Sequence, residues 1–182
     1  CEAAAAEGLQ DFVVHAFTDG RDTAPRQAVN YLADLEAVLA ETGGRIGSVH
    51  GRYYAMDRDK RWERIARTYN CLVKGEGGHF DTAIAGVEAH YADDITDEFI
   101  APFTVGDIDS TIKEGDVVIC FNFRTDRCRE ITVALTQEAF GDLAMAPLPL
   151  HYVTMTNYDD TFKGVHVIYD KPNLEATLGE VI

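Results

Sequence analysis

The sequence predicts an α/β domain, layered α/β/α, in which a central mixed, largely parallel sheet is flanked by helices. Short apolar runs typical of buried strands alternate with segments whose apolar residues repeat every three or four positions. Three of the predicted strands open directly into loops rich in charged residues, where α/β folds usually carry their ligand site. With 182 residues, 46% of them hydrophobic, we expect one core and a single domain over residues 1–182.

The first predicted unit is a strand, a loop and a helix. The run LQDFVVHAF predicts a buried strand, and TDGRDTAPRQ is a loop rich in Asp, Gly and Pro. Residues 28–39 carry apolar side chains at helical spacing, which predicts an amphipathic helix. Thr23 or a neighbour is expected to cap that helix, because short polar side chains accept hydrogen bonds from the first free amides.

Two later units repeat the pattern. RIGSVHG predicts a second strand that leads into GRYYAMDRD, and residues 60–73 predict a helix with one apolar side. DVVICFNF predicts a third strand, which opens into RTDRCREITVALTQ, where a helix is expected to begin. The alternation of strand, charged loop and helix indicates α/β layers.

The remaining chain supplies weaker predictions. Residues 82–92 predict another helix, and HYVTMTNY and GVHVIYD predict two further strands separated by a turn. The opening CEAAAAEG reads as the end of a helix stopped by glycine, which favours a segment from inside a longer protein. The rest of residues 75–116 shows no clear period and carries no functional prediction.

Charge excludes some partners. The net charge is −15, so the averaged electrostatic field repels nucleic acids and anionic membrane surfaces, and we expect neither as a partner. No apolar run approaches the roughly 20 residues of a membrane span. The four cysteines lack a CxxC spacing, which is typical of reduced thiols in a cytoplasmic protein. The six histidines lack paired-ligand spacing, so no metal site is expected within this chain.

Cationic side chains are concentrated at the three strand ends. The candidate ligand-binding residues are Arg21, Asp22, Arg52, Arg58, Arg124 and Arg127. If the three strands share one sheet, these loops converge on one pocket. Several guanidinium groups close together favour a ligand with two anionic groups, such as a phosphorylated carboxylic acid. Taken singly, each arginine is equally typical of a solvated surface.

Two details of this cluster are predicted from spacing. Arg124 and Arg127 are expected at the start of the helix that follows the third charged loop, on one face and near its positive end, which also favours anions. Asp22 has two interpretations that the residues leave open. It either orients the neighbouring guanidinium group as an ion-pair partner or accepts a hydroxyl group of the ligand.

Five segments carry a family resemblance: HAFTDGRDTAPR, GRYYAMDRDKRWER, DVVICFNFRTDRCREI, MTNYD and PNLEATLGEVI. In this order they closely resemble segments of the 2,3-bisphosphoglycerate-independent phosphoglycerate mutases. The resemblance runs from Val14 nearly to Ile182. It implies a glycolytic and gluconeogenic enzyme of two domains, of which this chain is the inserted phosphotransferase, or substrate-binding, domain.

The resemblance also implies what lies outside this chain. The other domain of these enzymes is similar to alkaline phosphatases and holds a serine nucleophile and two divalent metal ions, commonly manganese. No cofactor is expected in the fragment, and no 2,3-bisphosphoglycerate is required. The implied partners are 3-phosphoglycerate, 2-phosphoglycerate and the missing catalytic domain of the same chain, in a cytoplasmic monomer.

Carried over residue by residue, the family's substrate-binding arginines correspond to Arg21, Arg52, Arg58, Arg124 and Arg127. Its loop carboxylate corresponds to Asp22, which is implied to bind the hydroxyl groups and to act as an acid or base. The fragment is expected to bind phosphoglycerate without isomerising it. Two rivals remain open: an independent, non-catalytic anion-binding module, and a domain of another phosphomutase, such as one acting on pentose phosphates.

Overall fold

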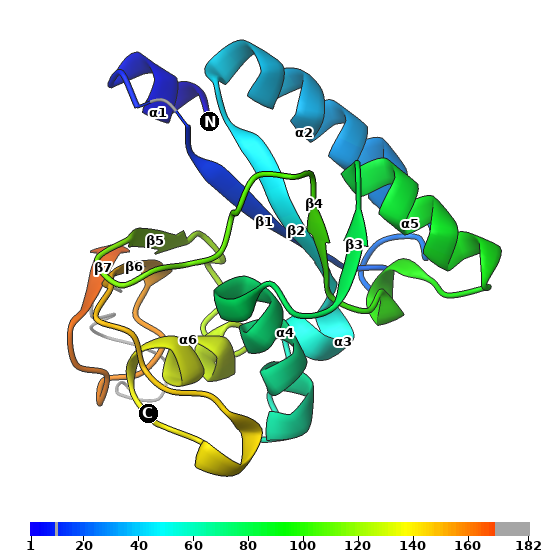
Figure 1. The fold of residues 1–182 in the computed structure, drawn as a ribbon. Coiled ribbons are helices and arrows are strands. Elements are labelled where there is room, and N and C mark those ends of the chain that lie inside the picture. The colour runs from blue at the N-terminus through cyan, green and yellow to red at the C-terminus, as the bar shows by residue number, and fades with distance from the viewer. Residues whose placement is uncertain (10, 170–182) are drawn as a thin grey trace, which may run out of the picture.

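The computed structural model describes residues 1–9 and 11–169, in which helices and strands alternate along the chain (Figure 1). The strands are β1 (Val13–Thr18), β2 (Arg45–Gly51), β3 (Gly78–Phe80), β4 (Phe103–Val105), β5 (Val117–Cys120), β6 (His151–Thr156) and β7 (Val165–Tyr169). The α-helices are α1 (Glu2–Ala6), α2 (Ala28–Thr42), α3 (Arg52–Ala55), α4 (Trp62–Lys74), α5 (Ala83–Ala92) and α6 (Arg129–Thr136). Two short 3₁₀ helices are η1 (Asp97–Phe99) and η2 (Gly141–Leu143).

The described strands form two sheets. The first has the order β1-β2-β4-β3, in which β1 pairs parallel with β2, β3 pairs parallel with β4, and only β2 and β4 are antiparallel. The second has the order β5-β6-β7 and is entirely parallel. The predicted α/β class and the mixed, largely parallel pairing are therefore confirmed. The third strand of the arginine-bearing units, β5, lies in the second sheet rather than beside β1 and β2.

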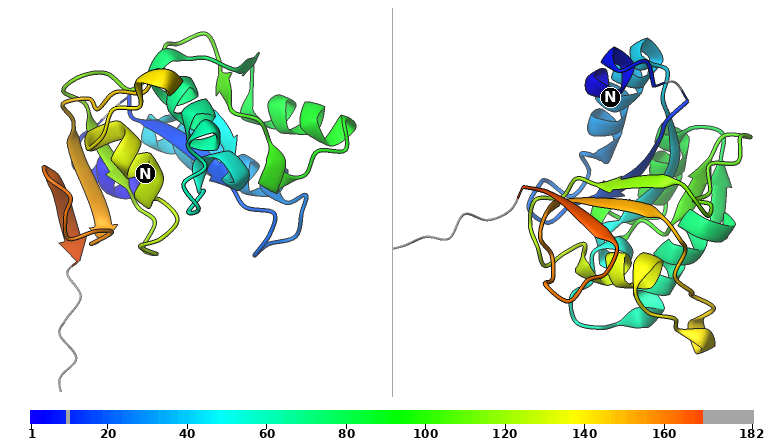
Figure 2. Two further views of the ribbon diagram at one scale, coloured as in Figure 1. Left: turned by 90° about the horizontal axis from the view of Figure 1, so that it is seen from below. Right: turned by 90° about the vertical axis from the view of Figure 1, so that its left-hand side faces the viewer.

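Each sheet has its own apolar core. Helices α2 and α5 cover one face of the first sheet, where Leu32, Val49 and Phe103 are buried (Figure 1). Helix α6 packs against the second sheet, and α4 joins this second core through Ile65 and Leu72. Figure 2 shows the second sheet at one end of the molecule beside α6, with α5 at the opposite end. The loops that leave β1, β2 and β5 meet between these two cores.

The start of α2 corrects one prediction. Thr23 does not cap this helix, because its Oγ1 accepts a hydrogen bond from the amide of Gly20. The carboxylate of Asp97, about seventy residues away, accepts instead from the amides of Gln27 (2.8 Å) and Ala28 (2.9 Å). A cap supplied from so far along the chain leaves no local sequence signal. At the other end the helix stops at Gly43, in the left-handed conformation that glycine adopts without strain.

The other predicted elements are confirmed with shifted ends, as in α4, which begins at Trp62 rather than Lys60. Among the described residues, no helix combines the length and apolar character needed to cross a membrane. The PNLEATLGEVI segment (172–182) lies outside the described residues.

Candidate functional site

The side chain of Asp22 joins three separate loops. Its Oδ2 accepts a hydrogen bond from Nη1 of Arg52 at 3.2 Å and lies 3.5 Å from Nη1 of Arg124. Asp22 belongs to the loop after β1, Arg52 follows β2, and Arg124 belongs to the loop after β5. The three predicted strand ends therefore meet at one carboxylate, although their strands belong to different sheets.

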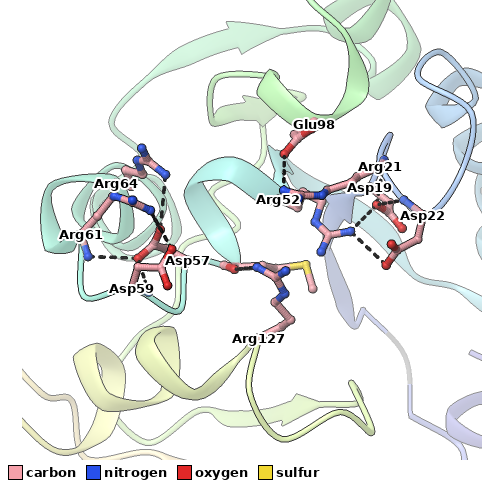
Figure 3. A network of polar contacts seen from close by, with 11 residues as sticks. Asp19, Arg21, Asp22, Arg52, Asp57, Asp59, Arg61, Arg64, Glu98 and Arg127 are labelled. Atoms are coloured by element: carbon pink, nitrogen blue, oxygen red, sulfur yellow. Dashed lines mark hydrogen bonds and ion pairs between the residues drawn. The ribbon is translucent and has the colours of Figure 1, made fainter.

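Arg52 is the buried member of the cluster. Only 6% of its side chain is exposed, and its Nη1 also donates to Oδ1 of Asp19 at 2.5 Å (Figure 3). Burial opposes its charge, but the two aspartates prevail and raise the pKa of Arg52. Against the same opposing effect of burial, the hydrogen bond from Arg52 lowers the pKa of Asp19. The pair is thus held fully ionised and fixes one guanidinium group at the end of β2.

The loop after β1 is shaped to present these carboxylates. Oδ1 of Asp19 accepts hydrogen bonds from the amides of Arg21 (3.0 Å) and Asp22 (3.1 Å), which folds the chain into a tight turn. Gly20 has a φ of +68°, and a Cβ there would stand 2.7 Å from the Cβ of Asp97. Only glycine lets the turn pack this closely against η1.

A second pair of contacts ties the β2–α4 loop to the β5–α6 loop. Nη1 of Arg58 lies 2.8 Å from Oδ2 of Asp126, and Nη1 of Arg127 donates to the carbonyl oxygen of Met56 at 3.3 Å. Partial burial, and then the positive charges of Arg52 and Arg58, lower the pKa of Arg127. The neighbouring guanidinium groups therefore repel the charge of Arg127, and a bound anion would reduce this repulsion.

Arg21 lies at the rim of the cluster. Its Nη1 is 3.7 Å from Oε1 of Glu98, and 64% of its side chain is exposed (Figure 3). Arg58 and Arg124 are also more than half exposed, at 52% and 62%. Ion pairs this open to water are weak. A ligand can therefore replace their carboxylate partners at little cost, while Arg52 stays anchored.

All six predicted site residues thus take part in one connected region. Their positions correct the predicted helix start, however, because α6 begins at Arg129 and Cys128 occupies its N-cap position. Arg124 and Arg127 lie in the loop before it, so neither the shared helical face nor the helix terminus explains their placement. The loop allows each guanidinium group to reach a different neighbour.

Other arginines from the same stretches serve the fold. Arg61 and Arg64 pair with the buried Asp57, at 3.5 and 3.4 Å (Figure 3). Arg67 stacks over the ring of Tyr54, 4.5 Å from its centroid. Sequence clustering alone does not separate these structural arginines from the site.

Three acidic partners in the cluster were missed by the sequence analysis: Asp19, Asp126 and Glu98. Asp19 and Asp126 stand two and one residues from predicted site arginines, so their position beside the charged loops was an available signal. Glu98 lies in the stretch without periodicity, and no local pattern indicates it. These carboxylates hold the guanidinium groups apart from one another.

Among the described residues, neither a group of metal ligands nor the cavity described next coincides with the predicted site residues. Within residues 1–9 and 11–169, no three His, Cys, Asp or Glu side chains are grouped so as to hold a metal ion. A cavity of about 310 Å³ is lined by His15, Ser48 and His79, among others, and contains none of the predicted site residues. Nδ1 of His15, in β1, is hydrogen-bonded to Oγ of Ser48, in β2, at 2.7 Å.

Comparison with known proteins places this chain in a family. Residues 1–160 match the model of the "BPG-independent PGAM N-terminus" family. The chain belongs to that family. A Bacteroides fragilis protein named 2,3-bisphosphoglycerate-independent phosphoglycerate mutase is 46% identical over all of this chain and 36% of its own length. A Flavobacterium johnsoniae protein of the same name is 50% identical, over 96% of this chain and 35% of its own.

A solved structure supports the same family assignment. A phosphoglycerate mutase from Leishmania mexicana, crystallised at low cobalt concentration, superposes with a TM-score of 0.80 at 34% identity, covering 87% of this chain and 32% of its own. The chain thus spans about a third of the length of these three relatives, each of which is named a phosphoglycerate mutase. The family expected from the sequence motifs is confirmed.

Proposed function

We propose that this chain is the substrate-holding domain of a cofactor-independent phosphoglycerate mutase, the enzyme that interconverts 3-phosphoglycerate and 2-phosphoglycerate. The observation that carries this proposal is the Asp22 contact with both Arg52 and Arg124, which gathers three loops around one place. Residues 1–182 form a single domain, and the catalytic domain belongs to the missing part of the same chain. The names of the relatives support this substrate.

In this proposal the guanidinium groups hold the substrate in place. A glycerate freed from its phosphoryl group would diffuse away, so its carboxylate must be held while the two hydroxyl groups exchange places. Arg52 is preorganised by Asp19 and offers fixed donors to one anionic group. The exposed Arg21, Arg58 and Arg124 exchange their carboxylate partners for oxygens of the ligand, and Arg127 adds positive charge behind them.

Asp22 adds a second role in this mechanism. Its carboxylate lies between Arg52 and Arg124, so a glycerate bound to those arginines brings its hydroxyl groups within reach of Oδ2. Asp22 accepts a hydrogen bond from each hydroxyl in turn and holds the proton that a phosphoryl transfer releases or requires. Both interpretations of Asp22 then apply: ion-pair partner before the ligand binds and hydroxyl acceptor afterwards.

The phosphoryl-transfer chemistry belongs to the missing domain in this proposal. A serine of that domain would take the phosphoryl group, and two divalent metal ions bound there, commonly manganese in this family, would supply Lewis-acid chemistry. The roles proposed for the residues of this chain are to bind and orient the substrate and to hold its protons. No 2,3-bisphosphoglycerate is needed, as the names of the relatives state of those proteins. The parent enzyme is a cytoplasmic monomer in this proposal.

The test is turnover by the full-length enzyme and by the 1–182 fragment. The full-length enzyme, without added 2,3-bisphosphoglycerate, should convert 3-phosphoglycerate to 2-phosphoglycerate and should not isomerise pentose phosphates. The rigorously purified fragment should bind 3-phosphoglycerate weakly, as shifts in its NMR spectrum, and show no turnover. Turnover by the fragment would place the nucleophile within these residues. Turnover of a pentose phosphate in preference to phosphoglycerate would replace the proposed substrate.

A further inference from the structure

Two cysteines flank the loop that carries Arg124 and Arg127. Cys120 is the last residue of β5 and is partly exposed, and Cys128 stands before α6 with 2% of its surface exposed. The two side chains belong to the same core and are connected by a chain of contacts: Tyr158 contacts Sγ of Cys120 and the backbone oxygen of Asn122, whose side chain contacts Sγ of Cys128. The seven residues between them include three members of the charged cluster, Arg124, Asp126 and Arg127.

The sulfur atoms lie among hydrogen-bond donors. The hydroxyl group of Tyr158 is 3.4 Å from Sγ of Cys120 and also donates to the carbonyl oxygens of Cys120 and Asn122. The side-chain amide of Asn122 donates to Sγ of Cys128 at 3.4 Å. Donors aimed at sulfur favour the thiolate over the thiol. These donors therefore favour a thiolate within this pair of cysteines.

The pKa values follow from these contacts. The S–H group of Cys128 and, against opposing burial, the hydroxyl group of Tyr158 lower the pKa of Cys120 to about 6. The same contact with Cys120, together with burial, raises the pKa of Cys128 well above its usual range. Burial alone raises the pKa of the distant Cys71 to about 12. A nucleophilic sulfur and a second thiol in the same core are the two components of a redox-sensing pair.

We infer that Cys120 and Cys128 form a redox-active pair, oxidised by a peroxide, whose disulfide rearranges the arginine-bearing loop. The thiolate of Cys120 attacks one oxygen of hydrogen peroxide, so an S–O bond forms, the O–O bond breaks, and the departing hydroxide takes a proton to become water. The sulfur of Cys128 then attacks Sγ of Cys120. An S–S bond forms, the S–O bond breaks, and the second hydroxide leaves as water with the proton of Cys128. Two thiols lose two electrons, and one peroxide gains them.

The effect on the loop passes through Asn122. Its side-chain nitrogen donates to Sγ of Cys128, and its Oδ1 accepts from the amide of Arg124 at 3.0 Å. A disulfide brings the two sulfurs to about 2.05 Å and takes Sγ of Cys128 out of its present contact with Asn122. The amide of Arg124 then loses its fixed acceptor. Because Arg124 faces Asp22 across the cluster, this consequence for activity rests on the proposed function, whereas the disulfide itself does not.

The experiment treats the reduced full-length enzyme with hydrogen peroxide and then with trypsin. Trypsin cuts after Arg124 and Arg127, so a Cys120–Cys128 bond joins peptides 114–124 and 128–129, which are otherwise separate. We expect this linked pair in most of the protein, a fall of at least fivefold in kcat/KM, and full recovery with dithiothreitol. The buried Cys71 serves as the internal control and should stay reduced.

Two variants are compared with the wild type in this experiment. C120S and C128A should each prevent the linked pair, and C120S, at the partly exposed position, should keep kcat/KM within twofold before and after peroxide. Circular dichroism verifies that each variant is folded. Absence of the linked pair while the exposed Cys1 becomes oxidised would overturn the inference. If folded C120S is as sensitive to peroxide as the wild type, or if the linked pair forms while kcat/KM is unchanged, the inferred effect of the disulfide on the loop is wrong. If the reduced enzyme fails to isomerise phosphoglycerate, the proposed function fails while the peptide analysis still decides the pair.

Discussion

Replacing Arg124 with alanine in the full-length enzyme should separate binding from folding. Arg124 is 62% exposed, and its ion-pair contact is with Asp22, at 3.5 Å, which is itself 57% exposed. Exposed pairs of this kind contribute little to stability. The free energy of unfolding should therefore change by no more than about 0.5 kcal/mol, as for other surface substitutions.

The kinetic effect should be much larger. If Arg124 donates a charge-assisted hydrogen bond to the substrate, its loss removes about 1.5–3 kcal/mol. Each 1.36 kcal/mol corresponds to tenfold in rate, so kcat/KM should fall by roughly 10- to 150-fold. A coupled assay that consumes 2-phosphoglycerate measures this fall, and urea unfolding of the same preparation measures stability.

The matched control is Arg26→Ala. Arg26 is also partly exposed and pairs with a single aspartate, Asp94, but it lies outside the cluster. Its removal should leave kcat/KM within twofold of the parent. Near-normal kinetics of Arg124→Ala would remove that residue from the site, and an equal fall in both variants would show that the loss does not come from the cluster.

Two further predictions concern Asp22 and acid stability. Asp22→Asn keeps the shape of the side chain but cannot hold a proton, so kcat should fall at least tenfold and the pH–rate profile should change shape, whereas unchanged turnover would rule out the proton role. Burial, and then the charge of Arg45, lower the pKa of His15 from 6.5 to about 4, so below pH 6.5 the unfolded state binds a proton that the folded state refuses. Stability should thus be complete above pH 6.5 and fall towards pH 4, by up to about 2 kcal/mol between pH 7.5 and 5 from this residue. Measured by urea unfolding, the free energy of unfolding of His15→Gln should fall less between pH 7.5 and 5 than that of the parent protein. The substitution His79→Gln, at an exposed histidine, should not change this fall, and an equal fall in the parent and both variants would refute the assignment.

Much of the fold follows from local pattern. Strand β5 is a continuous apolar run and β1 is largely apolar, and α2 and α4 have helical apolar spacing, so the sequence of each of these segments indicates its structure without its neighbours. The division of the strands between two sheets could not be predicted from local sequence pattern. Which strand lies beside which depends on contacts between distant segments, and β5 pairs with β6 rather than with β1.

The charged cluster was predictable as a set of residues but not as a set of contacts. Charged loops after apolar strands indicated all six residues in advance. Their partners were not indicated, since Arg58 pairs with Asp126 from sixty-eight positions away and Arg21 reaches Glu98. The failed prediction of Arg124 and Arg127 at a helix start has the same origin, because loop conformation there is set by tertiary contacts.

The sequence by itself determined the secondary structure, the acidic background and the arginines at three strand ends, because these depend on residue identity and short spacing. The tertiary structure alone decided that one carboxylate, Asp22, joins Arg52 to Arg124, that Asp97 caps α2, and that Cys120 and Cys128 belong to the same core. Such contacts join side chains whose energies depend on burial and on the direction of nearby charges. Those quantities exist only once the chain has folded.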